Sequence, residues 1–136
     1  MSQKMTSQAR ALLERPVIAN IATVSRSGKP QLSPVWIDVD GDDIIFNTAD
    51  GRQKPTNLRA NPAVAISVVD PDDPYTVLLV RGVVKEITED GADAHIDFLA
   101  SKYLGKPSYP FRQEGERRLK VRVSTEKIIA QPADPA

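Results

Sequence analysis

The sequence contains no cysteine, only one histidine and no excess of charge of either sign. Without cysteine, disulfides, thiol chemistry and cysteine-ligated metals are excluded, and a cytoplasmic location is expected. Because His95 stands alone, we expect no histidine-based metal site. Lysine and arginine number 18, as do aspartate and glutamate. Nucleic-acid-binding proteins usually carry a basic surplus, so no nucleic-acid partner is expected.

Long apolar segments are also missing. No run approaches the roughly 20 residues of a membrane span, and residues 1–15 lack the apolar core of a signal peptide. We therefore expect neither a membrane partner nor secretion. The 136 residues, 40% of them hydrophobic, suffice for one domain with a modest core. Because no linker or repeat divides the chain, residues 1–136 are interpreted as a single domain, with residues 131–136 as a frayed tail.

Short β-type segments separated by turns dominate what is present. Apolar and β-branched residues predict strands over 17–24, 31–39, 44–48, 63–70 and 75–87, and in two pieces over 119–123 and 127–130. Helices are expected over 5–14, after Pro55 and over 90–104. Pro34 predicts an edge position or a bulge, and Gly82 a bend. Hairpin turns leave little room for crossovers, so the pattern predicts a mainly β fold, an antiparallel barrel of about six strands with a few short helices.

The most informative segment runs from Asn47 to Arg59. It follows an apolar strand, contains a turn, and places Arg52 and Lys54 just before Pro55. Proline is favoured in the first turn of a helix, and the free N–H groups at that end attract anions. The segment thus predicts a phosphate-binding clamp. The alternative is a pair of solvated cations in an exposed turn.

Few other residues suggest chemistry. We interpret His95, in the middle of a predicted helix, as a surface or packing residue. Paired aspartates at 42–43 and 72–73 are interpreted as turn formers. Trp36, the only tryptophan, either packs in the core or forms a wall beside a planar ligand. Tyr103, Tyr109 and Phe111 either line a pocket or plug the barrel end.

The order of these segments resembles the split β-barrel flavin/deazaflavin oxidoreductases, the family of pyridoxamine 5′-phosphate oxidase. The matching segments are 11–13 with 18–24, 28–36, 52–59, 61–65, 82–84 and 102–105, so the resemblance covers about residues 6–130. It implies an FMN-binding split barrel of six antiparallel strands. Within the family, the chain is most similar to reductases that use coenzyme F420, a deazaflavin.

The resemblance also implies a site at a homodimer interface. Arg52, Lys54 and Asn57 would hold the cofactor phosphate, and Tyr75 would reach its tail from the second subunit. The lysine–threonine pair common in the family is interrupted by Pro55, which puts Thr56 in doubt as a phosphate ligand. The ring system would contact a further set of residues from two strands: Gln31, Ser33, Pro34, Val35, Trp36, Asn47 and Thr48.

The implied function is an F420H2-dependent reductase that transfers a hydride from the reduced deazaflavin to a small conjugated or quinone-like substrate. No side chain stands out as catalytic, and either Tyr109 or solvent would supply the proton. Two alternatives stay open. One is an FMN-dependent enzyme of the pyridoxamine-phosphate oxidase type, and the other is a non-catalytic protein that binds or stores the cofactor.

Overall fold

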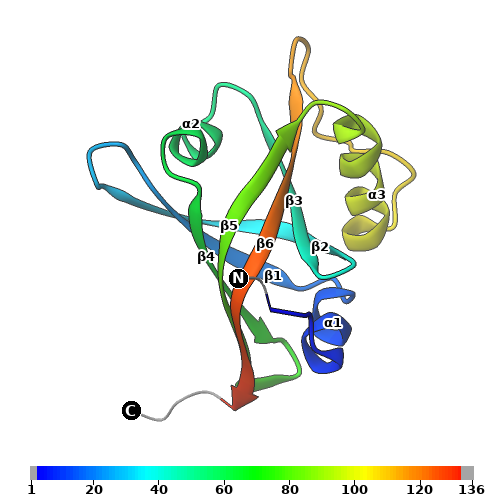
Figure 1. Cartoon of the computed structure of the whole chain (residues 1–136). Helices are drawn as coiled ribbons and strands as arrows, with labels where there is room; N and C mark the ends of the chain where they lie inside the picture. The colour runs from blue at the N-terminus through cyan, green and yellow to red at the C-terminus, as the bar shows by residue number, and fades with distance from the viewer. Residues whose placement is uncertain (1–2, 133–136) are drawn as a thin grey trace.

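The computed structural model describes residues 3–132 (Figure 1). Its elements follow one another as α1 (Ser7–Leu13), β1 (Ile18–Val24), β2 (Pro30–Asp40), β3 (Asp43–Ala49), α2 (Gln53–Ala60), β4 (Ala63–Asp70), β5 (Asp73–Thr88), α3 (Ala92–Leu104) and β6 (Arg118–Pro132).

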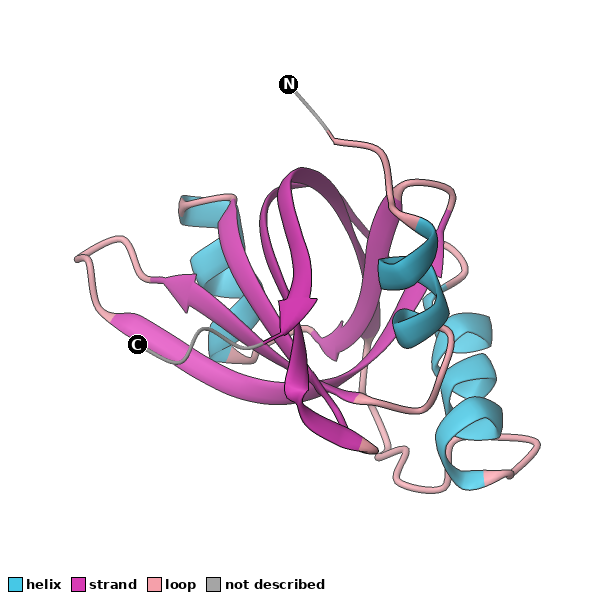
Figure 2. Cartoon of the chain, turned by 90° about the horizontal axis from the view of Figure 1, so that it is seen from below, coloured by secondary structure: helices cyan, strands magenta, loops and turns pink. Residues whose placement is uncertain are grey.

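The strands form a closed antiparallel barrel with the order β1-β2-β3-β6-β5-β4. The predicted six-stranded antiparallel barrel is therefore confirmed. Helices α1 and α3 lie on one side of the barrel and α2 on the other (Figures 1 and 2). Closure leaves the sheet without a free edge along most of its length.

Alternate residues of each strand point into the barrel and form its core. Ile21 of β1 and Phe46 of β3 are fully buried there, and Leu13 of α1 and Leu58 of α2 belong to the same apolar cluster. Burying a leucine side chain contributes about 1.5–3 kcal/mol. The two helices are thus held against the barrel by the same burial that holds the strands together.

The bend predicted at Gly82 has a steric cause. A Cβ atom at this position would lie 2.6 Å from Cγ1 of Val123 and 2.7 Å from the backbone oxygen of Ser124. The pairing of β5 with β6 shifts register between Arg81 and Gly82. Only glycine lets β6 approach this closely, so the prediction of a bend is confirmed.

The chain end differs from expectation. Residues 118–132 form one strand rather than two pieces. Arg81 pairs with Lys127 and Gly82 with Thr125, so Glu126 has no partner on β5 and forms a bulge. Of the expected frayed tail, Gln131 and Pro132 pair with β5, and residues 133–136 lie outside the described part of the chain. The loop expected over 71–74 is shorter, because β5 already begins at Asp73.

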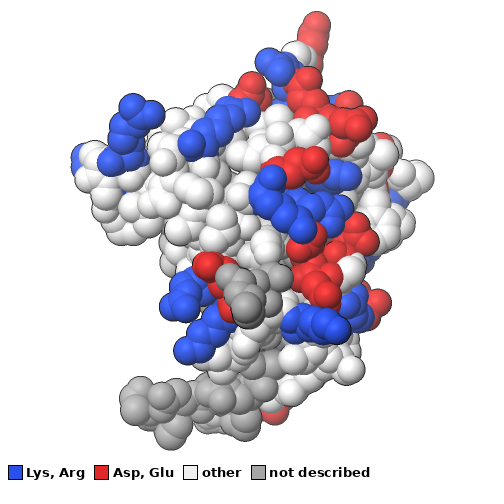
Figure 3. Space-filling view, viewed as in Figure 1, with Lys and Arg blue, Asp and Glu red and all other residues white. Residues whose placement is uncertain are grey.

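Charged side chains of both signs lie among uncharged areas on the face seen in Figure 3. Over the strands β5 and β6 they are interspersed rather than separated by sign (Figure 3). No helix within residues 3–132 is long and apolar enough to cross a membrane.

Candidate functional site: an open seam between two strands

The barrel opens where β2 and β3 separate. The two strands pair only from Ile37 opposite Phe46 to Asp40 opposite Asp43. Residues 30–36 of β2 pair with β1 alone, so Pro34 occupies the edge position that its missing N–H predicted. A cleft of about 320 Å³ lies at this opening, a volume within the usual range of ligand sites.

The cleft brings residues from six elements and one loop together. They are Ile18 of β1, Pro34, Val35 and Trp36 of β2, Asn47 of β3, Arg52 and Lys54 at the start of α2, Ile96 and Leu99 of α3, Tyr109 and Phe111 of the following loop, and Arg118 of β6. Six of the predicted site residues are thus neighbours in space.

One end of the cleft is strongly cationic. Arg52 is the N-cap residue of α2, Lys54 follows two positions later, and Pro55 is buried in the first helical turn, as predicted. Burial lowers the pKa of Lys54, and the charges of Arg52 and Arg118 lower it further. Glu116 forms an ion pair with Arg118 at 3.0 Å and another with Arg52 at 3.9 Å. Among the described residues, no ion pair involves Lys54. Three cations therefore face one carboxylate.

A chain of buried polar groups continues from this end into the protein. The Nε atom of Arg118 donates to Oδ1 of Asn47 at 2.8 Å, and Nη1 donates to Oε1 of Glu116 at 3.0 Å. The side-chain amide of Asn47 donates to the backbone oxygen of Ala92 at 2.9 Å and lies 3.3 Å from Nδ1 of His95. Each buried group thereby has a partner, as buried polar atoms require.

These contacts determine which ring nitrogen of His95 donates a hydrogen bond and which accepts one. The amide nitrogen of Asn47 can only donate, so Nδ1 of His95 must accept. The other ring nitrogen, Nε2, then carries the proton and lies 3.2 Å from Oδ2 of Asp38. His95 is buried, which agrees with the packing interpretation. Its ring links β2 to β3 and so positions Asn47.

The other end of the cleft is aromatic. Trp36 is stacked on Tyr103 with ring centroids 5.1 Å apart, and meets Tyr109 edge-on at 6.0 Å. Phe111 packs edge-on against Tyr109. The guanidinium of Arg118 lies 5.2 Å from the Tyr109 ring centre, where a cation–π contact is favourable. Trp36 is therefore a half-buried wall of the cleft, backed by Tyr103.

Tyr103 itself supports the structure. Its hydroxyl accepts a hydrogen bond from the backbone N–H of Ile37 at 2.9 Å and donates to the backbone oxygen of Val17. Burial raises its pKa to about 12, so the hydroxyl keeps its proton at neutral pH. Lys102 donates to the backbone oxygens of Leu13 and Ile37. Together the two residues anchor the end of α3 to β2 and α1.

Two buried hydroxyls at the seam have no partner. Oγ of Ser33 and Oγ1 of Thr48 are buried, and neither makes a hydrogen bond. Ser33 precedes Ile37 on β2 and Thr48 follows Phe46 on β3, so both lie where the strands have separated. An unpaired buried hydroxyl is costly. Neither Ser33 nor Thr48 lines the cleft, so a ligand would reach their hydroxyls only by inserting between the separated strands.

The structure places the other predicted residues elsewhere. Asn57 donates to Oγ1 of Thr23 and accepts from Gln53, and Thr23 also contacts Gln31. Gln31 and Asn57 thus share a network outside the cleft, and their predicted cofactor contacts stay predictions. Tyr75 is 73% exposed at the start of β5 and does not line the cleft. Its predicted contact needs a second subunit.

Sequence reasoning missed Arg118 and Glu116, and it gave Asp38 no role. The only local signal was a charged run, 116–118, before a strand, which normally indicates a solvated turn. Among the described residues there is no group of three or more histidines and carboxylates that could hold a metal ion.

Comparisons with known proteins agree with this arrangement. The sequence model of the family described as pyridoxamine 5′-phosphate oxidase matches residues 5–131. The fold is similar to that of an F420 reductase, with 38% identity, a TM-score of 0.80, and coverage of 88% of this chain and 94% of that chain.

Two more distant structures share the fold. A conserved hypothetical protein from Mycobacterium tuberculosis is 22% identical, with a TM-score of 0.75 and coverage of 94% of this chain and 85% of that chain. General Stress Protein 26 from Bacillus anthracis is 15% identical, with a TM-score of 0.68 and coverage of 92% of both chains. A search of curated proteins found no match. Since the family model spans nearly the whole chain, this protein belongs to the pyridoxamine 5′-phosphate oxidase family.

Proposed function

We propose that the protein is an F420H2-dependent reductase of small conjugated or quinone-like substrates. The observation that carries the proposal is the open seam, where the cationic start of α2 lines a cleft beside the part of β2 that has no partner on β3. The similarity to an F420 reductase over most of both chains supports this choice of cofactor.

The residues present fit a phosphate-bearing cofactor with a polar planar ring. Arg52 and Lys54 would hold the phosphate, with the N–H groups of the first turn of α2 adding to the attraction. The hydroxyls of Ser33 and Thr48 would form hydrogen bonds with polar atoms at the edges of the ring. Because Lys54 has no carboxylate partner among the described residues, a bound phosphate would supply the missing counter-charge.

When bound, reduced F420 supplies a hydride. The protein contributes position and environment. Trp36, Tyr109 and Phe111 line the cleft beside the seam, and their rings would align a planar substrate. Holding two reactants together makes the transfer effectively intramolecular. The hydroxyl of Tyr109, or water, would supply the proton that completes the reduction.

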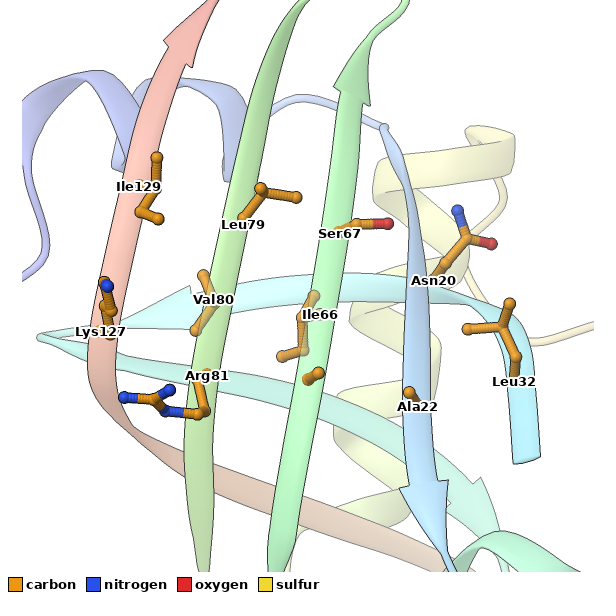
Figure 4. A pocket seen from close by; sticks show the side chains of 11 residues that line it. Asn20, Ala22, Leu32, Ile66, Ser67, Leu79, Val80, Arg81, Lys127 and Ile129 are labelled. Carbon is orange, nitrogen blue, oxygen red and sulfur yellow. The ribbon is translucent and has the colours of Figure 1, made fainter. Parts of the chain in front are cut away.

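We propose further that two chains associate through the outer face of the barrel. Figure 4 shows Leu79, Ser67, Asn20 and Leu32 side by side on the neighbouring strands β5, β4, β1 and β2. Leu32 is 69% exposed and Leu79 is 42% exposed, and burying this apolar surface would stabilise the association of two copies. A second copy would cover it and would bring its own Tyr75 toward the cofactor tail.

Sedimentation velocity at low micromolar concentration tests the dimer. We expect about twice the mass of one chain, and dissociation when Leu79→Asp places a charge on this face. Leu104→Asp is the matched control, because Leu104 is also an exposed leucine but lies at the end of α3. A monomer that binds cofactor fully would contradict the shared site.

Titration of the purified protein with F420 and with FMN tests the function. We expect F420 to bind more tightly, and reduced F420 to reduce a quinone or enone in air without forming peroxide. Lys54→Ala should weaken binding by about 1–3 kcal/mol. Unchanged binding in this variant would refute the clamp.

The alternatives predict different results in the same experiment. The matching family model favours an FMN-dependent oxidase, which would bind FMN, show its longer-wavelength absorption and release stoichiometric peroxide without activity on F420. A storage protein would bind the cofactor tightly and show no turnover with any acceptor.

A further inference from the structure

Arg118 differs from the other two cations of the cleft in where it lies. Arg52 and Lys54 belong to the start of α2, and Lys54 lies 6.0 Å from the ring centre of the core residue Phe46. The guanidinium of Arg118 shares Glu116 with Arg52 but also lies 5.2 Å from the ring centre of Tyr109, so it borders the aromatic half of the cleft. A cation here faces the space assigned to the substrate.

The protein also fixes which part of Arg118 is available. A guanidinium is a rigid planar fork, and Asn47 and Glu116 occupy its Nε and Nη1 atoms. The hydrogen bonds of the described residues do not use Nη2. Among the described residues, the only buried polar side-chain atoms without a partner are Oγ of Ser33 and Oγ1 of Thr48. Nη2 has no partner and is not one of them, so it is in contact with solvent. Since Arg118 lines the cleft, an Nη2 without a protein acceptor must reach its open space.

We propose that Arg118 is a catalytic residue that binds the carbonyl oxygen of a planar conjugated substrate. The inference rests on the proposed function for its source of hydride. A hydrogen bond from Arg118 to this oxygen narrows the substrate class to α,β-unsaturated carbonyl compounds and quinones. In both, the oxygen lies in the plane of the conjugated system. Asn47 and Glu116 act as positioning residues, because they hold the guanidinium in one orientation.

With bound F420H2 as the hydride donor, a C–H bond would form at the β-carbon of the substrate, and the donor would be oxidised by two electrons. The C=C electron pair moves toward the carbonyl, which leaves negative charge on its oxygen as an enolate. Nη2 of Arg118 donates to that oxygen. A proton from Tyr109 or water then arrives at the α-carbon, and the carbonyl re-forms. Preorganised donors aimed at a developing charge are among the strongest catalytic devices.

Binding of two small probes to the full chain tests the assignment without any cofactor. 4-Nitrobenzoate carries a negatively charged oxygen in the plane of its ring, and 4-nitrobenzamide is its neutral counterpart. Both quench tryptophan fluorescence, and Trp36 is the only tryptophan and lines the cleft. We expect the wild type to prefer the benzoate by roughly tenfold or more, the usual effect of a hydrogen bond to a charged group.

Three variants test whether Arg118 causes the preference for the benzoate. Arg118→Gln should reduce it to near one. Arg117→Gln should leave it unchanged, because Arg117 is a neighbouring arginine that is 64% exposed and pairs with Glu89 and Asp50 outside the cleft. Since Arg118→Gln leaves the buried Glu116 with only Arg52 at 3.9 Å, the double variant with Glu116→Gln should restore stability and still lack the preference. A wild type without preference, or an Arg118→Gln or double variant that keeps it, overturns the proposal.

Single-turnover kinetics with F420H2 and a cyclic enone add a second readout. Arg118→Gln should slow the hydride transfer roughly tenfold or more and leave the affinity for F420 unchanged. If it instead weakens F420 and inorganic phosphate to the same extent as Lys54→Gln, Arg118 belongs to the phosphate clamp and the proposal is wrong. If the wild type binds neither F420 nor FMN, the proposed function fails, whereas the probe preference still decides the role of Arg118.

Discussion

Replacing Lys54 by methionine should separate the role of its charge from the role of its stem. Methionine keeps an unbranched apolar side chain and removes the ammonium group. In the free protein that group is half-buried, and both burial and the nearby charges of Arg52 and Arg118 lower its pKa. A lowered lysine pKa means that the fold disfavours the charged form. We therefore expect the variant to be at least as stable as the wild type and to bind its ligand worse.

The magnitudes follow from this environment. Relief of like-charge repulsion at a partly exposed site is worth about 0.5 kcal/mol after screening. For a chain of this size, 1 kcal/mol shifts the thermal midpoint by roughly 3–4 °C, so the free variant should gain about 2 °C. Loss of a charge-assisted contact with phosphate costs about 1.5–3 kcal/mol, which weakens binding roughly 10- to 150-fold.

Thermal unfolding followed by circular dichroism, with and without cofactor, measures both effects. A ligand at 100 times its dissociation constant stabilises the wild type by about 2.7 kcal/mol, or roughly 9 °C. If affinity falls about 50-fold, the same concentration stabilises the variant by only about 0.7 kcal/mol, or roughly 2 °C. Lys106→Met, at an exposed lysine outside the cleft, should keep the full ligand-induced shift.

One result would refute the reasoning. If Lys54→Met lost more than about 1 kcal/mol of stability and kept the ligand-induced shift, the lysine would serve the packing against Phe46 rather than an anion. The clamp at the start of α2 would then have no role in binding.

Four further outcomes are expected. Affinity for a phosphate-bearing cofactor should fall as pH rises from neutral toward the ordinary lysine pKa of 10.5, because anion binding needs charged Lys54 and its pKa is lowered; titrations with Lys54→Arg should show no such fall. Asn47→Leu removes the partner of three polar groups and should lower the thermal midpoint by about 10 °C, or about 3 kcal/mol. Gly82→Ala should cost about 1–3 kcal/mol in urea unfolding, because its Cβ would meet Val123 and the backbone. Trp36→Ala should slow single-turnover reduction in the fraction that stays folded, and an unchanged rate would make the indole a packing residue only.

Local chemistry accounts for the parts of the fold that the sequence could predict. Pro34 cannot donate a backbone hydrogen bond, and it lies where β2 has no partner on the β3 side. Gly82 permits an approach that no side chain would allow. The unbroken β6 was not predictable in this way. Polar residues around Glu126 interrupt its apolar pattern, and only the matching irregularity of β5 shows that Glu126 is a bulge within one strand.

In the candidate site, too, the residues with a local sequence signal were predictable, and those placed by contacts between distant elements were not. Arg52 and Lys54 were predictable because they are close in sequence and Pro55 marks the start of their helix. Asn57 lies in the same helix, but the spacing within a helix does not reveal partners from other elements. Thr23 of β1 and Gln53 already occupy its amide. A contact with a ligand would require Asn57 to exchange one of these bonds.

The position of Arg118 depends on a pairing between distant strands. Ala49 of β3 lies opposite Arg118 of β6, and Asn47 opposite Lys120. Residues directly opposite share a face of the sheet, and so do residues two positions apart. This register brings Arg118 to Asn47 at the end of the cleft, 71 positions away in sequence.

The neighbouring arginine shows how much depends on that register. Arg117 is 64% exposed and pairs with Asp50 and Glu89, whereas the side chain of Arg118 is 3% exposed. The charged run 116–118 contains no feature that identifies which arginine is buried. Because side chains alternate between the two faces of a strand, a shift by one residue would exchange them. The cation that we assign to the substrate oxygen is therefore selected by the pairing of β3 with β6, and no inspection of the segment by itself could have found it.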